Sequence, residues 1–255
     1  MKSDPAEPNG IDLKKLPRHV AVIMDGNGRW AKKRLMNRVN GHRQGSETVR
    51  DIVTACRELG IEVLTLYAFS TENWSRPAAE VTALMGLLKR FLRSEQDDLH
   101  SKGIRLNVIG QKYRLPADVQ AEIDGAASKT RNNTGMVLNL ALSYGGREEI
   151  TMAAKRLAED LASGKILAGD ITETALADRL YTGGMPDPDI VIRTSGEMRL
   201  SNFLLWQAAY AEIFITDTLW PDFSKQEFLD IVREYQTRDR RYGKVVCTSN
   251  DGSQQ

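Results

Sequence analysis

The feature that most constrains the fold is the segment His19–Trp30, HVAVIMDGNGRW, in which an apolar run ends abruptly at Asp25. Such a run predicts a buried strand, and the strands of an open α/β sheet present ligands at their carboxyl ends. Glycines let backbone N–H groups approach an anion closely, Asp25 can hold a divalent cation, and Arg29 can pair with phosphate oxygens. The segment therefore indicates a phosphorylated ligand with a hard metal ion. An ordinary strand-to-helix turn capped by Asp25 and Asn27 fits the pattern equally well.

Short apolar runs alternate with stretches of helical spacing along the whole chain. The candidate strands are 19–25, 62–69, 104–109, 136–143, 188–194 and 211–216, and the candidate helices are 44–60, 78–101, 116–131, 146–163 and 224–241. Strands separated by helices of this length favour βαβ units, and no linker-like composition divides the chain. We predict a single α/β domain with a mostly parallel central sheet of about six strands flanked by helices.

Composition sets wide limits on function. The 255 residues include 35 Lys and Arg against 34 Asp and Glu, so no global charge favours nucleic acid as a partner. There is no P-loop pattern, no GxSxG elbow and no apolar run near the ~18 residues that span a bilayer. The N-terminal residues lack a signal-peptide core. Cys56 and Cys247 match no metal or redox spacing, so we expect free thiols and a cytoplasmic protein.

Polar and basic residues gather in two further segments. Segment 34–45, RLMNRVNGHRQG, predicts either a solvated basic loop or a phosphate site beside Asp25, with Arg38 and His42 as donors. Segment 70–77, STENWSRP, follows the near-continuous apolar run VLTLYAFS, which is typical of a buried parallel strand. We expect its tryptophan to pack over a ligand or a hinge, although part of the segment also fits a helix capping box.

A fourth cluster begins at Arg193, which ends an apolar run and is followed closely by Arg199 and Ser201. Two arginines and a hydroxyl make a good clamp for pyrophosphate, because a diphosphate offers several bidentate faces. Glu212 stands alone at the start of another apolar run, where an acid is costly unless it is paired or bound to a cation. The pattern predicts Asp25 and Glu212 as partners around one Mg²⁺. An exposed acid at a strand edge is the alternative for Glu212.

Five blocks of the chain, in order, resemble the cis-prenyltransferases, and within that family the bacterial undecaprenyl diphosphate synthases. These blocks are HVAVIMDGNGRW, RVNGHRQG, YAFSTENWSRP, NLALSYGGREEI and DIVIRTSGEMRLSNFLLWQAAYAE. The resemblance runs from about residue 17 to 243. It implies a catalytic domain over 17–243, with a flexible arm at 1–16 and a flexible tail at 244–255.

The resemblance also implies a reaction. Isopentenyl diphosphate would be added repeatedly, with cis geometry, to farnesyl diphosphate, giving a polyprenyl diphosphate of undecaprenyl length for the lipid carrier of cell-wall glycans. It implies a homodimer that requires Mg²⁺ and a hydrophobic product tunnel, and it leaves peripheral membrane contact for product release open. The alternatives are a shorter-chain synthase, a non-catalytic subunit of a heteromeric prenyltransferase, and a phosphate-ester hydrolase with Asp25 as its nucleophile.

The implied site residues fall into groups by matching position. The allylic diphosphate site comprises Gly26, Asn27, Gly28, Arg29, Trp30, Arg38 and His42. The next substrate-binding segment comprises Ser70, Thr71, Glu72, Trp74 and Arg76. The isopentenyl diphosphate site comprises Arg193, Arg199, Leu200 and Ser201. Asp25 and Glu212 are implied Mg²⁺ ligands, with Glu212 near a second subunit, and Arg241-Tyr242-Gly243 resembles a C-terminal element near the dimer interface.

Asp25 and Asn73 are the implied catalytic residues. The resemblance implies Asn73 as the proton acceptor, but a neutral amide is a very weak base. We therefore expect Asn73 to orient the substrate by hydrogen bonding, while Asp25 or the diphosphate takes the proton.

The candidate helix around 81–92 carries an unusually wide apolar arc. By itself this arc fits a helix packed on two sides or a helix that lines an apolar cavity. The resemblance favours the cavity, and it suggests Ala68, Leu84, Leu88 and Leu142 as wall positions of the product tunnel.

Overall fold

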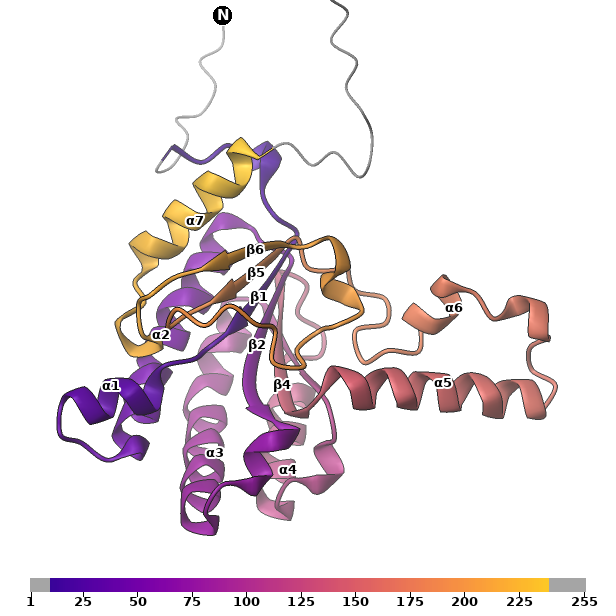
Figure 1. Cartoon of the computed structure of the whole chain (residues 1–255), viewed down its shortest axis with the longest axis horizontal. Helices are drawn as coiled ribbons and strands as arrows, with labels where there is room; N and C mark the ends of the chain where they lie inside the picture. The colour runs from indigo at the N-terminus through magenta and orange to yellow at the C-terminus, as the bar shows by residue number, and fades with distance from the viewer. Residues whose placement is uncertain (1–9, 239–255) are drawn as a thin grey trace, which may run out of the picture.

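All six predicted strands are present in one parallel sheet. The computed structural model describes residues 10–238 (Figure 1). The strands are β1 His19–Ile23, β2 Val63–Ser70, β3 Ile104–Ile109, β4 Met136–Tyr144, β5 Ile190–Arg193 and β6 Glu212–Ile215. Every neighbouring pair is parallel, and the order across the sheet is β3-β4-β2-β1-β5-β6. The predicted α/β class and strand number are confirmed.

Seven α-helices flank this sheet within residues 10–238. They are α1 Asn27–Lys33, α2 Arg38–Leu59, α3 Ala78–Ser101, α4 Ala117–Thr130, α5 Gly146–Ala162, α6 Glu173–Ala177 and α7 Lys225–Thr237. The first and the sixth were not predicted because they are short, and α1 begins with two residues of low helix propensity, asparagine and glycine. Figure 1 shows α5 projecting away from the sheet.

Helix α2 begins at Arg38, whereas the sequence pattern predicted a helix from 44. The Asn37 side chain caps it by accepting a hydrogen bond from the Asn40 N–H. The glycines that suggested a loop serve close packing instead. A Cβ at Gly41 would lie 2.0 Å from the Asn27 carbonyl oxygen, and one at Gly45 would lie 2.3 Å from the Asn27 Oδ1 atom. The predicted basic loop is therefore largely the first turns of α2.

The two faces of the sheet pack into different apolar clusters. Val20 and Val22 of β1 are fully buried in a cluster that includes residues of α2, α3, α4 and α7. Ala21 and Ile23, which point to the other face, pack in a cluster with Phe203. Both faces of β1 are therefore buried, which explains its continuous apolar sequence.

The sheet order places the candidate site at one edge of the sheet. Strand β1 lies between β2 and β5, and Ile23 is in register with Arg193. The chain that follows β1, the segment that follows β2 and the end of β5 therefore meet at the carboxyl edge. The connection runs from β1 to β2 on one side and later returns to β5 on the other, which is the arrangement that opens a crevice for ligands.

The ends of the chain are described only in part. Part of the predicted flexible arm lies within the described residues. There Ile11 is fully buried and Asp12 exchanges hydrogen bonds with the Gln236 side chain on α7, while Leu13 is half exposed. Residues 244–255 and the element 241–243 lie outside the described residues. No helix within 10–238 combines the length and the apolar character needed to cross a bilayer.

The predicted free thiol at Cys56 is confirmed, while Cys247 lies outside the described residues. Cys56 sits fully buried on α2, and burial raises the pKa of its thiol well above the ordinary value. The thiol is therefore protonated at neutral pH and acts as a small apolar core group.

The close contact between α1 and α2 makes a testable prediction about stability. Gly41→Ala should lower the free energy of unfolding by about 2 kcal/mol or more, because its Cβ would overlap the Asn27 carbonyl oxygen. Gly125→Ala is the matched control on α4, where a Cβ would meet no atom within 4 Å. It should raise stability by about 0.5–1 kcal/mol. Denaturant titration measures both, and equal effects would contradict the packing argument.

Candidate functional site

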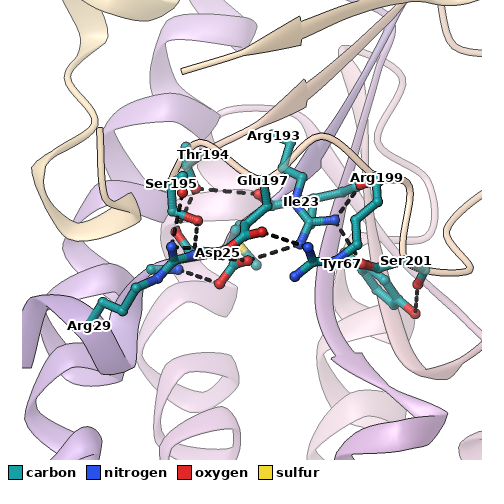
Figure 2. Close-up of polar contacts among 12 residues, drawn as sticks. Ile23, Asp25, Arg29, Tyr67, Arg193, Thr194, Ser195, Glu197, Arg199 and Ser201 are labelled. Atoms are coloured by element: carbon teal, nitrogen blue, oxygen red, sulfur yellow. Dashed lines mark hydrogen bonds and ion pairs between the residues drawn. The ribbon is translucent and has the colours of Figure 1, made fainter. Parts of the chain in front are cut away.

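The centre of the site is an ion pair between Asp25 and Arg193 (Figure 2). Arg193 Nη2 lies 2.9 Å from Asp25 Oδ2, and the Arg193 side chain is only 5% exposed, whereas that of Asp25 is 33% exposed. The Gly26 N–H donates to Asp25 Oδ1 at 2.7 Å, and Arg29 Nη2 lies 3.3 Å from Oδ2. Burial alone would raise the pKa of Asp25, but these hydrogen bonds and the Arg29 charge lower it below its ordinary value. The carboxylate is therefore ionised at neutral pH.

Arg193 connects this carboxylate to the loop that follows β5. Its Nη1 atom donates to Ser201 Oγ at 2.7 Å and also to the Arg199 carbonyl oxygen. Its Nε atom is buried and has no hydrogen-bond partner among the described residues. Arg193 thus holds the site together from within, whereas the Arg199 side chain is 60% exposed and accessible to an anionic ligand.

A chain of charges links Arg29 to Arg199. Glu197 Oε1 lies 3.1 Å from Arg29 Nη1, and Glu197 Oε2 lies 2.6 Å from Arg199 Nη1. Arg29 also donates to the Ser195 carbonyl oxygen at 3.0 Å and to the Ser195 hydroxyl (Figure 2). Ser195 and Glu197 were not predicted as site residues. Their position directly after the apolar run that ends at Arg193 is the only signal for them in the sequence.

The backbone of the loop after β5 is unusual. Ser195, Ser201, Asn202 and Leu204 all have positive φ, at 79°, 48°, 63° and 42°. Non-glycine residues in this region cost about 1 kcal/mol or more each, and such residues concentrate at functional sites. The surrounding contacts therefore hold this loop in a conformation that it would not adopt on its own.

The segment after β2 forms a 3-10 turn over Thr71–Ser75. Asn73 Oδ1 accepts a hydrogen bond from the Ser70 N–H at 3.2 Å, in a capping box. This box caps the 3-10 turn itself and not the following helix α3, whose N-cap is Pro77 without a side-chain cap. The Trp74 indole N–H donates to Ser143 Oγ at 2.8 Å, and its ring packs edge-on against Phe69. Trp74 therefore anchors the segment to the body of the protein.

Arg38, His42 and Arg76 come together around a residue that was not predicted, Glu80. Glu80 Oε1 lies 3.2 Å from Arg76 Nη1 and 3.5 Å from Arg38 Nη1. Burial and the charge of Arg76 lower the pKa of His42 to about 4, with Glu80 opposing and Arg38 adding to this effect. His42 is therefore neutral at pH 7, which makes it a hydrogen-bonding group and not a cation for phosphate.

The residues around Arg29 on α1 are mostly held in packing. The Trp30 indole N–H donates to Asp222 Oδ1 at 2.7 Å, and Arg34 lies 4.0 Å above the Trp30 ring. Gly26 has a φ of 109°, and a Cβ there would lie 3.0 Å from the Leu219 backbone. Gly28 lets the Arg38 side chain approach, because a Cβ would lie 3.3 Å from its Nε atom.

An apolar cavity of about 180 Å³ opens beside these groups. Its lining includes the polar side chains of Asn27, His42, Ser46, Asn73 and Arg76. The remaining lining is largely apolar and comes from β2, β4, α2 and α3; it includes all four predicted wall residues, Ala68, Leu84, Leu88 and Leu142. The wide arc of α3 therefore does line a cavity, next to the polar site.

Glu212 and Asp25 of the same chain lie far apart in the fold. Glu212 begins β6 in register with Ile190, and its carboxylate pairs with Arg238 Nη1 at 2.7 Å. Glu212 lies level with Val20, three residues or roughly 10 Å before the end of β1, and Asp25 lies beyond that end. The two residues are also separated by two strand spacings, roughly 10 Å, across the sheet. A single chain does not bring them to one ion, contrary to the prediction from the residues.

Within residues 10–238, no three His, Cys, Asp or Glu side chains are grouped to hold a metal ion. Mg²⁺, however, usually keeps several waters and is bound through one or two carboxylates and substrate phosphates. Asp25 fits this mode, because its carboxylate is ionised and one third exposed. It could therefore hold Mg²⁺ together with a bound diphosphate.

The lowered pKa of His42 predicts a loss of stability in acid. The unfolded chain binds a proton at His42 near the ordinary pKa of 6.5, and the folded protein does so only near 4. The unfolded state therefore binds more protons between these values, and stability falls as the pH decreases from about 6.5 to about 4. His42→Asn should reduce this loss by about 1–3 kcal/mol in denaturant titrations at several pH values. His100→Asn, at an exposed histidine of α3, is the control and should keep the wild-type profile.

Comparisons with known proteins agree with this geometry. Residues 23–243 match the family described as "Putative undecaprenyl diphosphate synthase". The isoprenyl transferase of Geobacter sulfurreducens is 53% identical over 245 residues, which is 96% of this chain and 100% of that protein. The isoprenyl transferase of Agrobacterium fabrum is 51% identical over 91% of this chain and 94% of its own length.

Two crystal structures share the fold. Lavandulyl diphosphate synthase from Lavandula x intermedia, solved in complex with dimethylallyl diphosphate, has a TM-score of 0.88 at 38% identity and covers 91% of this chain and 100% of its own. A probable undecaprenyl diphosphate synthase from Campylobacter jejuni has a TM-score of 0.74 at 37% identity and covers 89% and 99%. With this fold, this site and these relatives, the chain belongs to the cis-prenyltransferase family of isoprenyl transferases.

Proposed function

We propose that the protein is a Mg²⁺-dependent cis-prenyltransferase that adds isopentenyl diphosphate repeatedly to farnesyl diphosphate and makes a polyprenyl diphosphate of undecaprenyl length. The observation that carries this proposal is that a charged site and an apolar cavity lie side by side. An arginine and carboxylate cluster suited to diphosphates lies beside an apolar cavity of about 180 Å³ suited to a hydrocarbon. A substrate with a diphosphate head and a prenyl chain matches both.

The polar groups divide between two diphosphates. Arg199, with its exposed guanidinium, and Ser201 would bind isopentenyl diphosphate, while Arg193 holds them in place. Arg29, which is half exposed, would bind the allylic diphosphate, with Arg76 and His42 at the cavity lining nearby. Glu197 pairs with both Arg29 and Arg199 in the free protein, so an incoming diphosphate would compete with it for both cations.

Asp25 would hold Mg²⁺ together with the allylic diphosphate, and the ion would supply positive charge against the oxygens of the departing diphosphate. The arginines add to this stabilisation from fixed positions, and they need little reorganisation during the reaction. Their placement is constrained by hydrogen bonds, since Arg29 also contacts Ser195 and Arg193 also contacts Ser201.

In the proposed reaction the C–O bond of the allylic diphosphate breaks and its electron pair leaves with the diphosphate. The C=C bond of isopentenyl diphosphate attacks the allylic cation, and loss of a proton restores a double bond. Asn73 Oδ1 accepts from the Ser70 N–H, which leaves the amide NH₂ group to orient a substrate oxygen. Asp25 is a weak base because its pKa is lowered, so the departing diphosphate is the better proton acceptor.

A homodimer is part of the proposal. Among the described residues β6 is an edge strand of the sheet, and it exposes Ile213 and Ile215, at 46% and 37%. Exposed apolar residues on an edge strand favour association. If Glu212 takes part in Mg²⁺ binding, it must do so toward a second copy, because it lies far from Asp25 in its own chain.

The decisive experiment is to incubate the purified protein with Mg²⁺, farnesyl diphosphate and labelled isopentenyl diphosphate and to size the extracted products. We expect a ladder of products that ends near undecaprenyl length. A shorter end point would keep the chemistry and favour a shorter-chain synthase. Release of inorganic phosphate without elongation would favour a hydrolase, and no reaction would favour a non-catalytic subunit.

The Asp25 carboxylate should be essential for turnover. Asp25→Ala should lower kcat by about 10² or more, because it removes the metal-binding group and leaves the buried Arg193 without its counter-charge. Asp160→Ala is the matched control, since Asp160 lies on α5, which projects away from the sheet (Figure 1), and its removal breaks another Asp–Arg pair, to Arg179 at 2.7 Å. Steady-state elongation rates compare the two, and near-normal turnover of the Asp25 variant would refute the metal assignment.

A further inference from the structure

Asn202, the residue after Ser201, connects three separate parts of the site. Its Nδ2 atom donates to Glu72 Oε1 at 3.0 Å, and its Oδ1 atom accepts from the Arg147 N–H at 2.9 Å. Its carbonyl oxygen accepts from the Gly146 N–H at 2.7 Å. The amide orientation is unambiguous, because a backbone N–H can face only the oxygen and a carboxylate only the NH₂ group.

The two glycines that follow β4 make room for this arrangement. A Cβ at Gly145 would lie 2.8 Å from Asn202 Nδ2 and 2.8 Å from Thr71 Oγ1. A Cβ at Gly146 would lie 3.2 Å from the Asn202 carbonyl oxygen. Gly145 has an ordinary extended backbone with a φ of −156°, so its lack of a side chain serves this close approach and not an unusual turn. Gly145, in the block SYGGRE, thus leaves the space in which the side chains of Asn202 and Thr71 pack against the backbone.

Asn202 also controls where Ser201 lies. Both residues have positive φ, a region that asparagine tolerates better than most side chains. Ser201 Oγ accepts from Arg193, and the Ser201 carbonyl oxygen lies 3.3 Å from the Tyr67 hydroxyl that donates to it. The contacts of Asn202 with Glu72 and with α5 therefore fix the residue next to Ser201, which Arg193 also holds by a hydrogen bond.

We propose that Asn202 is a positioning residue that sets the distance between the two diphosphate sites. Through Glu72 it holds the segment after β2, and through Ser201 it holds the loop after β5. The inference rests on the proposed function, in which these two segments bind the two substrates. Asn202 itself need not touch either substrate.

Asn202→Asp tests this role with little change in shape. The variant keeps the acceptor for the Arg147 N–H but places a carboxylate against Glu72 at about hydrogen-bond distance. At pH 8 the repulsion should raise the KM for isopentenyl diphosphate roughly tenfold or more, with a smaller change in kcat. Two adjacent carboxylates take up a shared proton as the pH falls, which restores a donor. The defect relative to wild type should therefore shrink toward pH 6.

Asn202→Ala separates this effect from simple loss of a contact. Asn202→Ala should also raise the KM for isopentenyl diphosphate. The ratio of its KM to the wild-type KM should, however, stay constant between pH 8 and pH 6. Asn133→Ala is the control, because the Asn133 side chain donates to the Ile104 carbonyl oxygen at 2.8 Å, at the start of β3 and away from the site. It should leave both KM values unchanged. Melting temperatures of all variants show whether any of them is unfolded.

Calorimetric binding of isopentenyl diphosphate with Mg²⁺, without primer, gives a second readout that needs no turnover. The inference would be overturned if Asn202→Asp kept the wild-type KM and affinity, or if both Asn202 variants lost affinity equally and independently of pH. In either case, elongation by the wild-type protein would still support the proposed function. If the wild type does not elongate, weaker binding by Asn202→Asp with recovery at pH 6 would still support the inference. A wild type that binds no diphosphate would overturn both.

Discussion

The ion pair between Asp25 and Arg193 is the constraint on which the rest of the site depends. Arg193 ends β5 and is almost fully buried, so its charge must be compensated where it lies. Because β5 neighbours β1 in the sheet, with Ile23 and Arg193 in register, the carboxylate two residues beyond β1 reaches it. The remaining donors of Arg193 then fix the loop through Ser201. The position of the site thus follows from strand order and from the cost of burying one cation.

The parts of the structure that could be predicted are those with local signals. Continuous apolar runs identify buried parallel strands, and polar residues directly after them identify the carboxyl edge of the sheet. Arg193 and Ser201 were predicted to lie together for this reason, and the structure confirms it. The ion pair that joins Asp25 to them was not predicted. The wide apolar arc of α3 was likewise visible in the sequence, and its residues line the cavity.

The parts that could not be predicted depend on contacts between distant segments. Glu80 and Glu197 each pair with a nearby arginine, but each also joins a distant one, Arg38 or Arg29, that no local pattern reveals. Asn202 likewise acts through the Glu72 carboxylate, 130 positions away. Glycine was ambiguous in the same way: Gly41 resembled a loop residue, yet it lies in a helix that passes close to another backbone. Glu212 was misplaced because strand direction puts it at the opposite end of the sheet from Asp25.

The apolar cavity has a consequence for the end of the proposed reaction. Leu84, Leu87 and Leu88 on α3 are only partly buried in the free protein, so a hydrocarbon would complete packing that the chain leaves unfinished. Each CH₂ group that enters contributes about 0.8 kcal/mol, and the same amount must be returned when it leaves. A longer product would therefore dissociate more slowly into water than a short one. Transfer to a lipid bilayer or a detergent micelle would avoid this barrier, because the hydrocarbon chain stays out of water. The turnover rate would then depend on the lipid or detergent that accepts the product, and not on the chemical step.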